Sequence, residues 1–339
     1  MNEIYLTIFF ISLLLFLLGS GVWVALSMVA VSAIGMMLFT SRPVGDAMAT
    51  TIWGTSSSWS LTALPLFVWM GEILFRTKLS ENLFKGLSPW LSRLPGGLIH
   101  VNVVGCALFA AISGSSAATV ATVGKMSIPE LRKRKYPEKL LLGSLAGSGT
   151  LGLLIPPSII LIIYGVTIED SIAKLFMAGI LPGIMIALIF MSYVVIWSIL
   201  NKKLMPKNLQ NFSFSQKIKA SKQLFPVILL ITSVIGSIYT GIATATEAAS
   251  LGVLGALVLS WFQQTLNTKT FKLSLLGATK TSCMIAFILA GSTFLSLAMG
   301  FTGLPRNLAV WINNMNLSPF MLIFILTIFY IILGMFLDG

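Results

Sequence analysis

Long apolar runs alternate along this chain with short segments rich in lysine and arginine. Most of the runs approach or exceed the roughly 20 residues that an α-helix needs to cross a bilayer. They lie at residues 4–18, 21–40, 60–75, 140–166, 171–200, 223–243, 248–264, 281–300 and 318–337. The pattern predicts an all-α polytopic membrane protein, and since Glu3 is the only charge before the first run, we expect no cleaved signal peptide.

Composition and charge placement support a membrane protein. Of the 339 residues, 56% are hydrophobic and 9% are charged, whereas soluble domains carry about 25% charged residues. The net charge is +12, and 19 of the 22 basic residues lie in four segments, at 76–93, 125–139, 202–222 and 269–280. The positive-inside rule places these segments in the cytoplasm. We therefore expect contact with the lipid bilayer and no nucleic-acid partner.

A polar interruption, "SGSS" at residues 113–116, lies within the apolar segment 98–127. The segment begins and ends beside basic loops, so it enters and leaves on the same side. Its arms, 98–112 and 116–127, extend only about 18–22 Å as helices, less than the hydrocarbon core of about 30 Å. Non-helical backbone at that depth must be buried in protein or line a watery cavity. We predict a re-entrant helical hairpin whose tip lines an internal polar site.

A second interruption lies in the run at 140–166. Glycines loosen this helix and two prolines remove backbone donors, at Gly147, Gly149, Gly152, Pro156 and Pro157. Hydroxyls are supplied nearby by Ser148, Thr150 and Ser158. Freed carbonyls and hydroxyls suit Na⁺, and half-helix N-termini suit a carboxylate. The alternative is a proline kink satisfied by neighbouring helices; the tandem prolines beside a hairpin tip favour the site.

The chain also repeats itself with an offset of 225 residues. "LSENLFKGL" at 79–87 matches "LPRNLAVWI" at 304–312, and the same offset carries Ser113-Gly114 onto Asp338-Gly339. The charge bias gives the two copies opposite orientations in the membrane. Inverted repeats with broken helices are a design of secondary transporters.

Two stretches carry a family resemblance. "GGLIHVNVVGCALFAAISGSSAATVATVG" (96–124) and "GSGTLGLLIPPSIILIIYGVTIEDSIAKLFMAGILPG" (147–183) resemble the large membrane subunit of tripartite ATP-independent periplasmic (TRAP) transporters. "YTGIATATEAASLGVLGAL" (239–257) resembles a further family signature, with Ala245 where the family usually has proline. The resemblance covers essentially the whole chain.

The resemblance implies an elevator-type transporter of the bacterial inner membrane. A mobile domain with hairpins and broken helices would slide against a scaffold that a small four-helix membrane subunit enlarges. A periplasmic substrate-binding protein would deliver an organic acid anion, of dicarboxylate or sialic acid type, and Na⁺ would be the coupling ion, with no organic cofactor. Carried over residue by residue, the Na⁺ site would comprise Ser113, Gly114, Ser115, Gly149, Thr150 and Pro156. Substrate would lie near Ser115, Ser158 and Asp338.

Several acids, one histidine and two cysteines also lie in or beside the apolar runs. Asp338 follows a long apolar run, and an intramembrane acid is by default a functional candidate. We expect Glu72 to reach water from the cytoplasmic end of its helix, and Glu247 to favour a helix N-terminus or to tie the scaffold to the mobile domain. His100, Cys106 and Cys283 are expected to be packing residues, because their spacing offers no transition-metal site.

The predicted organisation has four parts. Residues 1–59 form scaffold helices, 60–166 the first repeat with hairpin 98–127 and broken helix 140–166, 167–265 further scaffold helices, and 266–339 the start of the second inverted repeat. We expect the chain to be truncated within its second hairpin. The alternatives are a non-transporting remnant or a sodium/dicarboxylate symporter that needs no binding protein. An enzyme is disfavoured because Ser113 has no base within the apolar arms.

Overall fold

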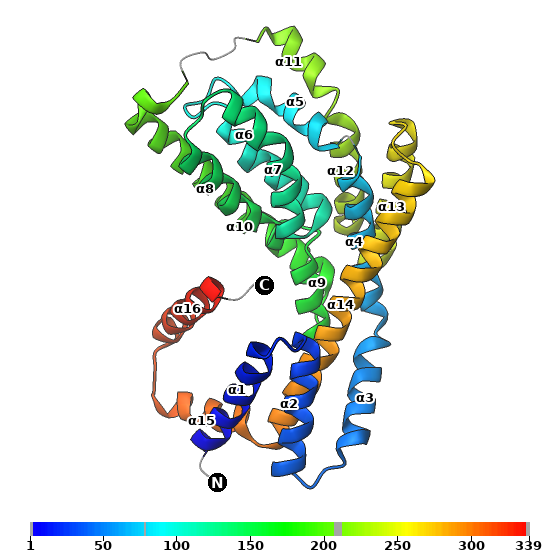
Figure 1. Ribbon diagram of the computed structural model, residues 1–339, viewed down its shortest axis with the longest axis vertical. Helices are drawn as coiled ribbons and strands as arrows, with labels where there is room; N and C mark the ends of the chain where they lie inside the picture. The colour runs from blue at the N-terminus through cyan, green and yellow to red at the C-terminus, as the bar shows by residue number, and fades with distance from the viewer. Residues whose placement is uncertain (1–2, 78, 207–211, 337–339) are drawn as a thin grey trace. The chain divides into compact units, whose positions relative to one another are not determined.

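The computed structural model describes residues 3–77, 79–206 and 212–336, and every regular element in those ranges is helical. These residues form two compact units (Figure 1): a terminal unit of residues up to 58 and from 283 onward, and a central unit of residues 59–282. The prediction of an all-α membrane protein is confirmed. The predicted domain boundaries and the inverted relation of the repeats stay predictions.

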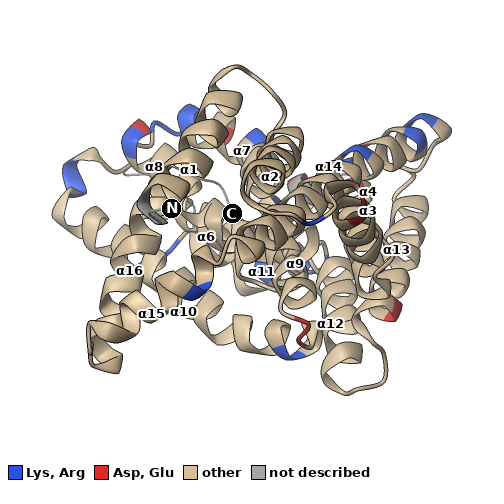
Figure 2. Ribbon diagram, turned by 90° about the horizontal axis from the view of Figure 1, so that it is seen from below, with Lys and Arg blue, Asp and Glu red and all other residues tan. Residues whose placement is uncertain are grey.

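Some of the helices reach the length that crossing a membrane requires, and other apolar helices are shorter. Among the described residues, three helices are individually long and apolar enough to span a bilayer: Ile172–Leu200, Ala245–Phe262 and Thr268–Phe301. Two bent helix pairs, if each is one span, raise this to five. Lys and Arg lie mainly at helix ends and in connecting segments (Figure 2), which leaves the helix bodies apolar.

The terminal unit packs the first helices of the chain against the last ones. Its elements are α1 (Glu3–Gly19), α2 (Val24–Phe39), α3 (Val44–Ser56), the part of α14 (Thr268–Phe301) from residue 283 on, α15 (Leu304–Asn314) and α16 (Pro319–Phe336). Met36 of α2 is fully buried with Phe294 and Ala298 of α14. At Gly291, α14 approaches α2 so closely that a β-carbon would lie 2.9 Å from the Ala25 carbonyl oxygen.

The central unit is built around one apolar helix, α6. Its elements are η1 (Trp59–Thr62), α4 (Ala63–Phe75), α5 (Leu79–Leu91), α6 (Ile99–Ser113), α7 (Ser116–Lys133), α8 (Glu138–Gly149), η2 (Thr150–Leu153), α9 (Ile159–Thr167), α10 (Ile172–Leu200), η3 (Lys202–Leu204), α11 (Phe214–Ser221), α12 (Phe225–Tyr239), α13 (Ala245–Phe262) and the start of α14. Helix α6 packs against α4, α5, α7, α8 and α10. Its Ile99, Phe109 and Ile112 are almost completely buried, so α6 fixes the hairpin within the unit.

The extent of the helices differs from the sequence prediction in two respects. Helix α7 continues to Lys133, six residues beyond the predicted arm 116–127. The prediction of loops in the basic segments is wrong: the segments 76–93 and 202–222 contain α5 and α11, and the segment 269–280 forms the first turns of α14. The side chain of Asn267 explains where α14 starts, since its Oδ1 accepts a hydrogen bond of 2.7 Å from the Thr270 N–H. Neither a proline nor a capping glycine interrupts the helix before its end at Phe301.

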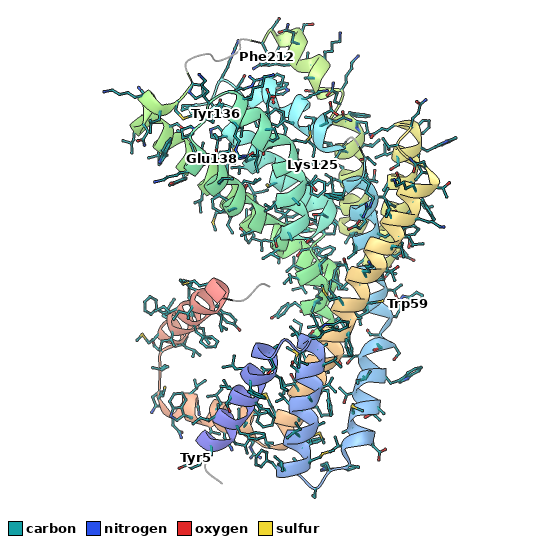
Figure 3. All side chains as sticks on the ribbon, in the orientation of Figure 1. Tyr5, Trp59, Lys125, Tyr136, Glu138 and Phe212 are labelled. Atoms are coloured by element: carbon teal, nitrogen blue, oxygen red, sulfur yellow. The ribbon has the colours of Figure 1, made fainter. Side chains whose placement is uncertain are left out.

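Polar contacts tie together the base of the hairpin, far from its tip. The Leu98 N–H at the start of α6 donates to the Tyr136 hydroxyl over 3.1 Å, and burial raises the pKa of that hydroxyl. Between α7 and α8, the Arg132 Nε donates to Glu138 Oε1 over 3.0 Å. The hydrogen bond from Arg132 lowers the pKa of the Glu138 carboxyl. Tyr136 and Glu138 are labelled in Figure 3.

Glu247 belongs to the start of α13. Its N–H donates to the Thr244 hydroxyl over 3.3 Å, and its Oε2 accepts from the Thr244 N–H over 2.8 Å. This reciprocal pair is a capping box. The expected preference of Glu247 for a helix N-terminus is confirmed, and the box is complete although Ala245 occupies the position where a proline was expected.

The contact at Gly291 predicts a stability effect. We expect Gly291→Leu to separate α2 from α14 and to lower the free energy of unfolding by about 1–3 kcal/mol through overpacking. Gly300→Leu is the matched control, because nothing lies within 4 Å of a β-carbon there. The thermal unfolding midpoint in detergent measures both; equal midpoints for the two variants would contradict the packing described for α2 and α14.

Candidate functional site

The hairpin tip is a tight turn between α6 and α7. Gly114 ends α6 in the left-handed conformation with φ of 59°, which favours glycine because it lacks a β-carbon. Ser115 follows in an extended conformation and caps α7, accepting from the Ala118 N–H over 3.5 Å. The polar "SGSS" therefore provides the turn that joins two helices. The predicted depth of this turn in the membrane stays a prediction.

Hydroxyl groups gather on the inner side of the turn. Ser113 Oγ lies 3.0 Å from Thr119 Oγ1, and Thr119 donates to the Ser115 carbonyl oxygen over 2.7 Å. Ser113 is 6% exposed and Thr119 is fully buried. Three oxygen atoms thus meet within an otherwise apolar interior. Thr119 was not among the residues predicted for the site, although its position four residues after Ser115 places both on one face of α7.

The broken helix meets this tip directly. The Ile159 N–H, at the start of α9, donates to the Gly114 carbonyl oxygen over 3.3 Å. A β-carbon at Gly114 would lie 2.7 Å from the Pro157 carbonyl oxygen, and one at Gly152 would lie 2.8–2.9 Å from backbone atoms of Ser115 and Ser116. The structure therefore brings the two interruptions into backbone contact, with no room for additional side chains.

Three other predicted site residues lie buried in or beside the broken helix. Ser158 is fully buried; it caps α9 and donates to the Leu153 carbonyl oxygen over 2.6 Å. Pro156 is buried against Gly179 of α10, and Gly149 packs against Val120 of α7.

Thr150 lies outside the cluster, and one predicted residue is not described. The Thr150 side chain is exposed, and its hydroxyl donates to the Gly147 carbonyl oxygen over 2.7 Å. Asp338 lies outside the described residues. Ser148 lies at the interface between α6 and α8, where its hydroxyl is 3.4 Å from the Asn102 carbonyl oxygen of α6 and donates to the Ser144 carbonyl oxygen of its own helix over 2.6 Å. The cluster therefore consists of the tip and of the residues that flank the Pro156-Pro157 break.

A small cavity of about 100 Å³ borders the tip. Its lining includes Ser113 and Ser115 of the hairpin, Glu72 of α4 and Thr281 of α14. Such a volume exceeds what one buried water needs. The hydroxyls of the tip therefore face a space in which water or an ion can be accommodated.

Glu72 lies near the end of α4, and the expectation that it reaches water there stays a prediction. Its Oε2 accepts from Arg76 over 2.9 Å, and its side chain is 25% exposed. The same carboxylate lies against Gly277 of α14, where a β-carbon would be 2.6 Å from Oε2. Glu72 thus forms one wall of the tip cavity with its charge paired. Thr281 joins it from a segment about 200 residues further along the chain, a neighbour for which the sequence offers no signal.

The atoms around the cavity that could act as cation ligands are oxygens, from hydroxyls, carbonyls and one carboxylate. Within the described ranges, no three His, Cys, Asp or Glu side chains gather closely enough to hold a metal ion. Oxygen ligands of this kind suit alkali and alkaline-earth cations better than soft transition metals.

Comparison with known proteins identifies relatives of this architecture. The family model for the "Tripartite ATP-independent periplasmic transporter, DctM component" matches residues 10–339. The C4-dicarboxylate TRAP transporter large permease protein DctM of Pseudomonas aeruginosa is 33% identical over 90% of this chain and 71% of its own length. The sialic acid TRAP transporter large permease protein SiaM of Vibrio cholerae is 31% identical over 95% and 75%, respectively. The ectoine/5-hydroxyectoine large permease protein UehC of Ruegeria pomeroyi is 32% identical over 98% and 77%.

The contact between tip and break predicts the effect of one methyl group. We expect Gly152→Ala to push the backbone at Ser115 away from η2, at a cost of about 1–3 kcal/mol, and to speed hydrogen exchange of the amides at 113–119. Gly143→Ala in α8 is the control, since no atom lies within 4 Å of its β-carbon and alanine favours the helix. Unchanged exchange at the tip in Gly152→Ala would exclude the close contact.

Proposed function

We propose a function for this chain from the family to which it belongs, the DctM component family of tripartite ATP-independent periplasmic transporters. The chain is a large permease subunit of the bacterial inner membrane. We propose that it imports an organic acid anion with Na⁺ as the coupling ion. Relatives are named for C4-dicarboxylate, sialic acid and ectoine. A dicarboxylate or sialic acid type of substrate agrees with the first two of these names.

The proposal includes two partners. A small four-helix membrane subunit would enlarge the scaffold, and a periplasmic substrate-binding protein would deliver the anion. The family description, which names a tripartite periplasmic transporter, supports a three-component system. The hairpin and the broken helix, α6 to α9, would move together as part of the transport domain of an elevator.

One observation carries the Na⁺ proposal: the hydrogen bond from the Ile159 N–H to the Gly114 carbonyl oxygen, which brings two interrupted helices together beside buried hydroxyls. Na⁺ would be bound there by oxygens from the tip and the break, drawn from Ser113, Gly114, Ser115, Gly149 and Pro156 of the predicted set, whereas Thr150 is exposed and bonded to Gly147. Thr119 adds a hydroxyl to this set, because it already touches both Ser113 and the Ser115 carbonyl. An ion bound there would hold the two interruptions together.

Two helix N-termini support the proposal of an anion site. Ser115 caps α7 and Ser158 caps α9, and the residues next to them are joined by the hydrogen bond between Gly114 and Ile159. The N-terminus of a helix carries partial positive charge and free N–H groups that favour a carboxylate. We place the substrate carboxylate near Ser115 and Ser158, with Asp338 as a further neighbour.

Removal of the Ser113 hydroxyl tests the Na⁺ site. We expect Ser113→Ala to raise the Na⁺ concentration for half-maximal uptake about tenfold, because a lost polar contact of this kind is worth about 1–2 kcal/mol. Uptake is measured in proteoliposomes that also contain the small subunit and receive the binding protein. Ser192→Ala is the control: that serine is exposed on α10 and bonded only to the Leu188 carbonyl. If Ser113→Ala leaves the Na⁺ dependence unchanged, the site is wrongly placed.

The tripartite assignment predicts a requirement for all components. We expect organic acid uptake under an imposed Na⁺ gradient only when the permease, the small subunit and the binding protein are all present. Omitting each in turn, with K⁺ replacing Na⁺ as a further arm, measures this. Uptake that persists without the binding protein would instead support a sodium/dicarboxylate symporter.

A further inference from the structure

A groove runs along α5 at the end of the central unit where the basic segments gather. It consists of two adjoining cavities of about 590 Å³ and 350 Å³, which share Lys85, Pro89 and Phe212. Helix α7 forms the far wall of the larger cavity and α11 that of the smaller one. Lys125 of α7 and Phe212, just before α11, are labelled in Figure 3. None of these residues belongs to the tip site.

The groove is lined by one face of each helix. Helix α5 contributes Glu81, Phe84, Lys85 and Ser88, positions three and four apart that share a face. Helix α11 presents Gln216, Lys219 and Ala220, again with helical spacing, and Gln223 follows its end. These faces are fixed in place: Trp90 of α5 donates to the Ser221 hydroxyl over 2.9 Å, and Leu224 fills the space beside Gly86.

Positive charge exceeds negative charge in the groove. Lys85, Lys125, Arg134 and Lys219 line it, against Glu81 and Glu130. Both acids are paired within the groove, Glu81 with Lys85 and Glu130 with Arg134. Lys125 and Lys219 are exposed and form no ion pair with any described residue. Two cations on opposite sides of Lys85 are therefore available to an anion.

The groove also has an apolar side. Phe84, Met126 and Pro129 line the larger cavity beside the charged groups. A soluble phosphate has no apolar atoms that could pack against this surface, whereas the glycerol and upper acyl carbons of a phospholipid would lie against it. The surrounding basic segments place this end of the unit at the cytoplasmic leaflet, where anionic lipids are available and basic pockets between helices recognise their headgroups.

We propose that the groove between α5, α7 and α11 binds the headgroup of an anionic phospholipid from the cytoplasmic leaflet. The phosphate lies near Lys85, with Lys125 on one side and Lys219 on the other, and the acyl chains leave past Phe84 and Met126. A lipid bound there would connect the hairpin helix α7 to α11 across α5. This proposal does not depend on the transported substrate or on Na⁺.

The test compares two double variants of equal charge in the full chain. Lys125→Gln/Lys219→Gln removes the two unpaired cations of the groove. Lys139→Gln/Lys203→Gln removes two exposed lysines that lie outside it. Binding of phosphatidylglycerol and of phosphatidylcholine is titrated by native mass spectrometry in detergent. We expect the groove variant to bind phosphatidylglycerol about 30-fold more weakly, because each lysine near an anionic headgroup is worth about 1 kcal/mol, and the control to bind like the wild type.

Three results would overturn the proposal. The first is equal loss of phosphatidylglycerol in the two double variants, which would indicate general charge attraction. The second is competition by glycerol phosphate at the same concentration as the lipid, which would indicate a soluble phosphate ligand. The third is unchanged lipid binding together with loss of the small subunit or of self-association in the groove variant, which would indicate a protein partner.

Discussion

At the membrane depth predicted for the two helix interruptions, backbone groups have to find partners inside the protein, because a membrane interior offers no water. An unpaired N–H or C=O there costs several kcal/mol, far more than the roughly 1 kcal/mol that an ordinary hydrogen bond contributes in net terms. The Gly114 carbonyl and the Ile159 N–H satisfy each other, and Ser158 satisfies the Leu153 carbonyl from within the break. The break thus supplies the hydrogen-bond donor for a carbonyl oxygen of the tip.

This mutual pairing explains the small residues around the site. Gly152 admits the backbone of Ser115, and Gly71 of α4 admits that of Ser113, where a β-carbon would lie 3.0 Å from Cα. The close approach brings α4 to the tip and, with it, the Glu72 carboxylate and the adjoining cavity. The same glycines that permit the fold therefore determine which oxygens gather beside the tip. A site of this kind is a consequence of helix breaks that face one another.

Much of this arrangement could be predicted from local sequence. The hairpin arms were too short to span, and the tandem prolines marked the break, so both interruptions and their proximity followed from composition and charge. Thr281 could not be foreseen, because its partner residues are distant in sequence and only packing brings them together. The contact of Glu72 with Gly277 of α14 could not be foreseen either, because charge bias locates a helix end but not the residues beside it. The basic segment at 269–280 was wrongly predicted as a loop because its lysines also suit a helix that extends past the membrane.

The central claim is that the tip and the break together form an ion site, and direct Na⁺ binding tests it without transport. Equilibrium binding of ²²Na⁺ to the purified chain would compare wild type with Thr119→Val, which removes the hydroxyl that touches both Ser113 and the Ser115 carbonyl. Thr119→Ser keeps that hydroxyl, and Thr167→Val alters an exposed threonine bonded only to Ile163. The account predicts Na⁺ binding about tenfold weaker in Thr119→Val alone. Equal binding in all four proteins would contradict it.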